Sequence, residues 1–215
     1  MVHPLQFRLR NWIETLASAR VIGSLLLLCA LSPQALSDSS TEGMQYLRQA
    51  ESLYQQKEFF QSARYAFAAL EKDPLLKPRA YAWISQGLIK AGLPHAASYF
   101  FIRTLQLGDP QAIRSVLSQT QALMSVVGPD VLRKYLVRHT RDQDYDLLSR
   151  SNYLYVLAKD ALLAGEYEKV IERVSAMSPR SLFWPFALQL RASAQAILGR
   201  NDLALSDFKN CEQSA

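Results

Sequence analysis

The sequence predicts an all-α protein made of about five helical hairpins in a row. From Asp38 onward apolar residues recur at helical spacing, and no run of alternating β-branched residues is bounded by turn signals. The breaks between helical runs recur at nearly constant distances along the chain. Small and large apolar residues also recur at fixed distances after each break. Together these features indicate a helical repeat array, or solenoid.

The breaks are marked by glycine in every unit except the first. The turn positions are Glu58, Gly92, Gly128, Gly165 and Gly199, with spacings of 34, 36, 37 and 34 residues. A tight turn between two helices needs a residue in the left-handed conformation, which glycine adopts at little cost. In the first unit we take Glu58 as the turn residue, because it lies 34 residues before Gly92.

Each second helix, except that of the middle unit, carries a small or β-branched residue five positions after the turn and a larger apolar one four positions later. These pairs are Ala63 and Phe67, Ala97 and Phe101, Val170 and Val174, and Ala204 and Phe208. Residues four apart lie on the same face of a helix. We expect each pair to face the first helix of its own unit, with the larger residue filling the space between the helices.

The first 37 residues have the pattern of a signal peptide. The apolar run VIGSLLLLCAL at residues 21–31 follows Arg8, Arg10 and Arg20 and is shorter than the about 20 residues of a spanning helix. Cleavage is expected after Ser37, which predicts export, in bacteria to the periplasm. In the alternative interpretation the segment is retained, and residues 4–31 anchor the protein at the membrane.

Four stretches carry a family resemblance. They are YQQKEFFQSARYAFAALEKDP (54–74), SQGLIKAGLPHAASYFFIRTLQLGDP (85–110), LAKDALLAGEYEKVIERVSAMSP (157–179) and RASAQAILGRNDLALSDFKNC (191–211). Their small residues, their aromatic residues and, in the first three, the closing prolines resemble the tetratricopeptide repeat (TPR) family, here as an exported bacterial TPR protein. The resemblance implies TPR-like units 1 and 2 over residues 42–110 and units 4 and 5 over residues 150–215.

The middle segment, residues 111–149, departs from this pattern. Arg133 stands at the small position, Val137 and not an aromatic residue stands four positions later, and RDQDYD (141–146) is inserted before the next unit. It is either a degenerate repeat with a linker or a pair of unrelated helices that bridges the two halves. The conserved spacing favours the degenerate repeat.

The composition gives no support for catalysis, cofactor or metal binding, or nucleic-acid binding. The net charge of +5 is spread along the chain. His3, His95 and His139 are far apart, and no phosphate-binding or nucleophile motif is present. Asp142 begins a sequence like a calcium loop, but Leu147 stands at the sixth position, where glycine is needed.

The densest basic stretch contains Arg133, Lys134, Arg138 and Arg141. With Leu132 and Leu136 it predicts an amphipathic helix with a charged face. That face is either simply solvated or contacts anionic lipid or an acidic partner.

The resemblance also implies a concave groove, lined by the first helix of each unit, that binds another protein or an extended peptide. The candidate groove residues are Arg48, Gln55, Arg79, Trp83, Gln86, Lys90, Tyr155 and Lys159. Trp83 stands where the asparagine of the family's carboxylate clamp would fall, so that activity is not implied. Basic and aromatic side chains suit an acidic or extended partner.

The sequence therefore predicts a non-enzymatic scaffold for protein–protein interactions. The alternative function is a membrane-tethered structural subunit of a cell-envelope complex. Leu203 and Cys211 lie on the outer side of the last predicted helix. We expect both to be partly exposed, which predicts a covering partner or end-to-end self-association.

Overall fold

The computed structural model describes residues 33–147 and 149–214, and the regular structure within them is entirely helical. The chain divides into two units, Met1–Glu42 and Gly43–Ala215. In the first unit only residues 33–42 are described, and they form the start of a helix. The predicted signal segment lies outside the described residues except for residues 33–37. No described helix combines the length and the apolar character needed to cross a bilayer.

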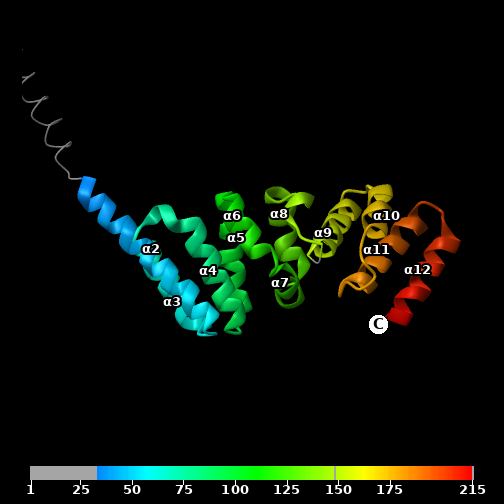
Figure 1. The fold of residues 1–215 in the computed structure, drawn as a ribbon. Coiled ribbons are helices and arrows are strands. Elements are labelled where there is room, and N and C mark those ends of the chain that lie inside the picture. Colours follow the sequence, from blue (N-terminus) through cyan, green and yellow to red (C-terminus); the bar gives the residue numbers. More distant parts are fainter. Residues whose placement is uncertain (1–32, 148, 215) are drawn as a thin grey trace, which may run out of the picture. The chain divides into compact units, whose positions relative to one another are not determined.

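The second unit is built from helices that pack mainly against their neighbours in sequence (Figure 1). The described helices of the whole chain are α2 (Pro33–Gln55), which begins in the first unit, α3 (Phe59–Lys72), α4 (Lys77–Lys90), α5 (Pro94–Leu107), α6 (Pro110–Leu117), α7 (Thr120–Val127), α8 (Pro129–His139), α9 (Arg150–Leu163), α10 (Tyr167–Ser175), α11 (Trp184–Ile197) and α12 (Asn201–Ser214). Short 3-10 helices, η1 (Pro74–Leu76) and η2 (Asp142–Asp144), precede α4 and α9. The predicted all-α fold is confirmed.

Four turns between paired helices share one backbone conformation. Their left-handed residues are Lys57, Gly92, Gly165 and Gly199, with φ of 66°, 79°, 75° and 75°. In each turn the next residue donates its N–H to a carbonyl five residues earlier, as Glu58 does to Leu53 at 2.9 Å. This bond satisfies a carbonyl that the helix end leaves free. The choice of Glu58 as the first turn position is therefore wrong, because Lys57 takes that conformation.

This correction moves the core register of the first unit by one residue. The residues five and nine positions after Lys57 are Ser62 and Ala66, and both are completely buried. Phe67, which we expected in the core, is 40% exposed and makes an edge contact with the ring of Phe100 on α5, with 5.2 Å between ring centroids. The predicted register is correct in two other units, where Ala97 with Phe101, and Val170 with Val174, are buried.

With the corrected register, two buried hydrogen bonds between paired helices lie at equivalent positions in their units. The Ser62 hydroxyl donates to the carbonyl of Ala50 at 2.7 Å, and the Ser85 hydroxyl donates to the carbonyl of Ala97 at 3.2 Å. Both bonds join positions twelve residues apart, seven before and five after the left-handed residue. Each bond satisfies a buried hydroxyl where the two helices approach closely.

The helices α3 and α4, from successive pairs, approach each other closely at Gly87. A Cβ atom placed on Gly87 of α4 would lie 2.7 Å from the carbonyl oxygen of Phe59 and 3.1 Å from the Cβ of Ala63. Ala63, which we expected to face the first helix of its own unit, therefore lies against α4 of the next pair. A side chain at residue 87 would force the two helices apart.

The middle segment contains three short helices, where a regular repeat would have two. The expected first helix is interrupted at Ser118 and Gln119, between α6 and α7. The Thr120 hydroxyl donates to the carbonyl of Leu117 at 2.7 Å, and the Gln119 side chain accepts from Ser85 at 3.2 Å. Contacts with α4 thus help to hold the break in place.

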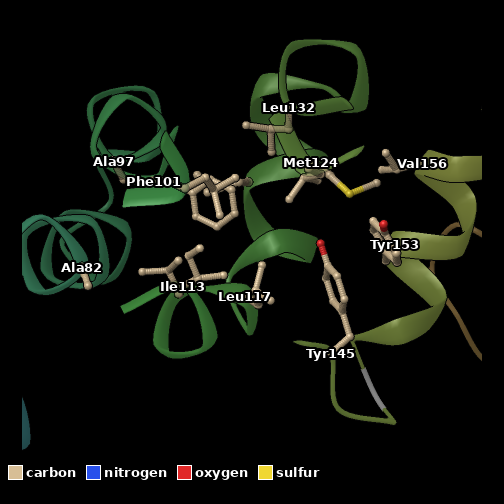
Figure 2. Close-up of a cluster of buried hydrophobic side chains, with 14 of the residues drawn as sticks. Ala82, Ala97, Phe101, Ile113, Leu117, Met124, Leu132, Tyr145, Tyr153 and Val156 are labelled. Carbon is tan, nitrogen blue, oxygen red and sulfur yellow. The ribbon is translucent and has the colours of Figure 1, made fainter. Parts of the chain in front are cut away.

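The buried core continues through these three helices (Figure 2). Phe101 of α5 lies beside Ile113 of α6, and Met124 and Leu132 lie between it and Val156 of α9. On the far side Tyr145 and Tyr153 stack with ring centroids 4.4 Å apart. The cluster of buried residues therefore extends from α2 to α11 without a gap at the irregular segment.

The last helix, α12, packs against α11. Asp207, buried in this interface, accepts two hydrogen bonds from Arg191, at 2.7 and 2.6 Å. Leu203 is exposed as expected, and Phe208 is 42% exposed, although the repeat pattern placed it in the core. Cys211 is buried, contrary to prediction, because its thiol is directed at the carbonyl of Pro185 on α11 at 3.4 Å.

Candidate functional site

A surface depression of about 250 Å³ extends over three successive first helices, α2, α4 and α6. Its lining residues are Glu51, Arg79, Ala82, Trp83, Gln86, Gln111, Ala112 and Ser115. It therefore unites three of the eight predicted groove residues, namely Arg79, Trp83 and Gln86, with side chains from both neighbouring units. We call this feature the α2–α4–α6 groove.

The helix α4 supplies the centre of the groove. Arg79, Trp83 and Gln86 are separated by four and three residues, which places them along one face of the helix. The buried Ala82 and Ala112 have small side chains and leave room for the depression.

The Trp83 ring is held from one side. It is half-buried and makes an edge contact with Tyr54, with ring centroids 5.5 Å apart. Burial raises the pKa of Tyr54, so its phenol stays protonated well above neutral pH. Tyr54 therefore supports one side of Trp83, which also lines the groove.

The polar groups of the groove offer both signs of charge and several hydrogen-bonding groups. Arg79 is exposed, and its only described side-chain contact is with the sulfur of Met44 at 3.6 Å. Glu51 lies on the same depression from α2. Gln86, Gln111 and the Ser115 hydroxyl can each donate and accept hydrogen bonds. This combination can bind the backbone amides of an extended peptide together with a carboxylate placed near Arg79.

Three predicted residues lie outside this groove. Arg48 and Gln55 are exposed on α2, and Lys90 is exposed at the end of α4, but none of them lines the depression. They lie along the same helices as its lining residues, one turn or more away from them.

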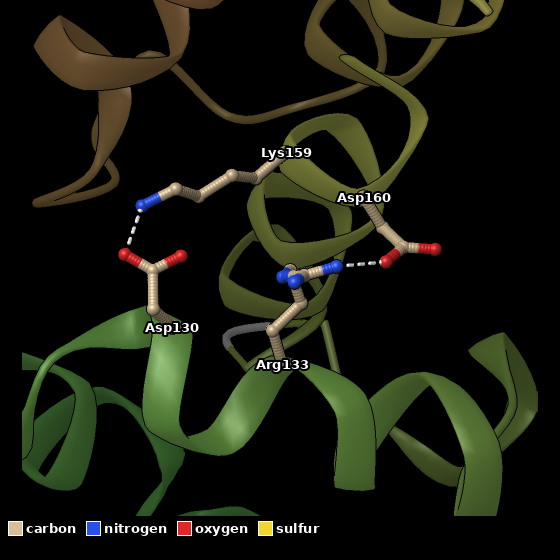
Figure 3. A network of polar contacts seen from close by, with 4 residues as sticks. All are labelled: Asp130, Arg133, Lys159 and Asp160. Atoms are coloured by element: carbon tan, nitrogen blue, oxygen red, sulfur yellow. Dashed lines mark hydrogen bonds and ion pairs between the residues drawn. The ribbon is translucent and has the colours of Figure 1, made fainter. Parts of the chain in front are cut away.

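Tyr155 and Lys159 lie on α9, in a different part of the molecule. Lys159 forms an ion pair with Asp130 of α8 at 2.7 Å, and the adjacent Asp160 pairs with Arg133 of the same helix (Figure 3). The Lys159 ammonium group is therefore committed to a contact between helices.

Tyr155 is buried, and burial raises the pKa of its phenol. Its ring stacks on Phe183 with 5.1 Å between centroids and an interplanar angle of 15°. It lines a separate apolar recess of about 580 Å³ whose other walls include Val126, Leu182 and Phe186. The eight candidates therefore do not form one continuous surface.

The repeat pattern did not predict the contributions of Glu51, Gln111 and Ser115 to the groove. Glu51 lies on α2 between the candidates Arg48 and Gln55. Gln111 and Ser115 belong to the middle segment, where the departure from the pattern gave no register from which to assign groove positions. Their spacing of four residues on α6 is the one sequence feature that places both on a single face.

The described residues contain no group of three or more His, Cys, Asp or Glu side chains placed to hold a metal ion. The carboxylate of Asp142, which begins the calcium-like sequence, forms an ion pair with Arg150 at 2.7 Å. Asp146, the last residue of the inserted segment, accepts from the N–H of Ser149 at 2.7 Å, just before α9. The inserted segment thus helps to start α9.

Comparisons with protein-family models, with curated proteins and with solved structures gave no match to this chain. The functional interpretation therefore depends on the geometry of the α2–α4–α6 groove and on the sequence pattern.

Proposed function

We propose that the protein is an exported, TPR-like scaffold that binds an extended segment of another protein in the α2–α4–α6 groove. The observation that carries this proposal is the depression formed by three successive first helices, with Trp83 at its centre. Helical repeat proteins commonly bind partners on surfaces built from equivalent helices of successive units. The TPR resemblance supports the same location.

The chemistry of the lining favours a protein ligand. A half-buried tryptophan beside an arginine is a typical anchor at protein interfaces, where these two residue types contribute much of the binding energy. The amides of Gln86 and Gln111 can pair with a peptide backbone, and Arg79 can pair with an acidic side chain. The preferred partner is thus an extended segment with at least one carboxylate.

Affinity purification with matched variants tests this proposal. The full-length protein is used as bait in an envelope extract of its own cells, and captured proteins are cross-linked and identified. Arg79→Glu and Trp83→Ala should reduce capture of a specific partner at least about tenfold, the order expected for interface hot spots. Lys90→Glu, an equal charge change on the same helix outside the groove, should leave capture unchanged.

Circular dichroism establishes that each variant is folded, so that a loss of capture reports on the groove. Equal capture by all variants would contradict the groove as the binding site. A loss with Lys90→Glu alone would move the site to the end of α4.

Export is part of the proposal, supported by the apolar run at residues 21–31 and the arginines that precede it. The intact mass of protein purified from its native cells separates a secreted scaffold from the membrane-tethered alternative. A chain that begins at Asp38 supports the scaffold, whereas a chain that retains residues 4–31 supports the tethered subunit.

A further inference from the structure

A second recess, on the irregular middle segment, is lined by arginine side chains from separate elements. It has a volume of about 470 Å³, within the roughly 300–1,000 Å³ typical of ligand sites. Arg114 comes from α6, Arg138 from the last turn of α8, and Arg141 from the residue before η2. The folding of the middle segment thus gathers charges that are 27 residues apart in sequence, from 114 to 141.

These three arginines lack acidic partners. None of them forms an ion pair with another described residue, whereas Arg133, on the same helix as Arg138, pairs with Asp160. Arg114, Arg138 and Arg141 are all exposed, so each guanidinium group can turn toward a ligand. Concentrating three such charges in one recess is unfavourable without a counter-charge, since like charges repel.

The acidic groups nearest in sequence do not neutralise the recess. Asp144 is the one carboxylate in its lining, against the guanidinium groups of three arginines, and it accepts a hydrogen bond from the backbone N–H of Arg141 at 2.8 Å. Asp109 accepts from the N–H of Ala112 at 2.7 Å, and Asp142 pairs with Arg150. The lining therefore keeps an excess of positive charge.

We propose that this recess binds a phosphate-type oxyanion, carried either by a phospholipid headgroup or by a free phosphate compound. Guanidinium groups present several N–H donors in a planar fork that matches phosphate oxygens. Three of them from different elements can contact different oxygens of one group. The half-buried His139 also lines the recess. This site is distinct from the α2–α4–α6 groove and does not depend on the proposed function.

The experiment measures binding of two probes to the full-length protein. Inorganic pyrophosphate, followed by isothermal titration calorimetry, represents the free compound. Vesicles of phosphatidylglycerol, with phosphatidylcholine vesicles as the uncharged reference, represent the headgroup. Arg114→Glu and Arg138→Glu should each weaken binding about tenfold or more, since each removes hydrogen-bond donors to a charged group and places a negative charge beside it.

Arg64→Glu is the matched control, because Arg64 is exposed on α3 and does not line the recess. Pyrophosphate binding that is lost only in the two recess variants supports the site with a soluble ligand. Binding only to phosphatidylglycerol vesicles, lost in the same two variants, supports it with a lipid headgroup. Absence of binding to both probes, or equal weakening by Arg64→Glu, would overturn the proposal.

Discussion

The left-handed residue Lys57 provides a sharp test of the turn register. Its φ of 66° is the one positive φ among the described residues that are not glycine. A side chain in the left-handed region costs about 1–2 kcal/mol. Replacing Lys57 by glycine removes this strain but gives the unfolded chain more freedom, which costs about 0.4–1 kcal/mol. We expect Lys57→Gly to raise the free energy of unfolding by roughly 0.5–1 kcal/mol.

The neighbouring residue is a control with the opposite expected sign. Glu58 has φ of −82°, makes no side-chain capping bond to α3, and is as exposed as Lys57. Glu58→Gly should therefore lower the free energy of unfolding by about 0.4–1 kcal/mol through the unfolded chain alone. Had Glu58 been the turn residue, the two signs would be reversed.

Urea unfolding followed by far-UV circular dichroism measures both variants. In thermal unfolding, Lys57→Gly should raise the midpoint by about 1–4 °C for a chain of this size. A Lys57→Gly variant that is neutral or less stable than wild type would refute the assignment of strain to this turn. An equal gain from Glu58→Gly would refute it as well.

Three further changes test the packing. Gly87→Ala should lower the free energy of unfolding, measured in urea, by about 1–2 kcal/mol. The added methyl group collides with α3, and this cost outweighs a helix-propensity gain of about 1 kcal/mol. A variant more stable than wild type would contradict this prediction. Asp207→Ala removes the acidic partner of Arg191 and should lower the free energy of unfolding by about 3 kcal/mol. Glu168→Ala breaks the exposed pair with Arg200 and should lower it by less than about 1 kcal/mol. Equal losses in the two variants would refute the distinction between buried and exposed pairs. Burial raises the pKa of the Tyr145 phenol above its ordinary value of 10.0. The unfolded chain therefore loses the phenol proton at lower pH than the folded chain, and the free energy of unfolding should fall above about pH 10. An equally steep fall in a Tyr145→Phe variant would count against this prediction.

The sequence was informative where glycine marks a turn. Gly92, Gly165 and Gly199 are left-handed as predicted, and the core pairs of two of these units follow at the expected distances. In the first unit the left-handed residue is a lysine, which has no preference for that conformation. The pattern therefore gave no means of choosing between Lys57 and Glu58, and the one-residue error placed Phe67 in the core.

The middle segment could not be predicted from local pattern, because its break depends on a distant contact. Neither Ser118 nor Gln119 is a residue that usually ends a helix, and Gln119 contacts Ser85 of α4. The same limitation applies to the candidate groove. Its α4 residues follow from helical spacing, but Gln111 and Ser115 join them only because α6 packs beside α4.

The packing of α12 determines where the folded protein is expected to open first in solution. Among the described helices, α12 has substantial contacts with α11 alone. Separating it would break the Arg191–Asp207 ion pair and expose the side of α11 that it covers. Such partial opening needs less free energy than global unfolding. The amide protons of α12 should thus exchange with solvent first, and irreversible aggregation on storage should begin with the apolar face of α11.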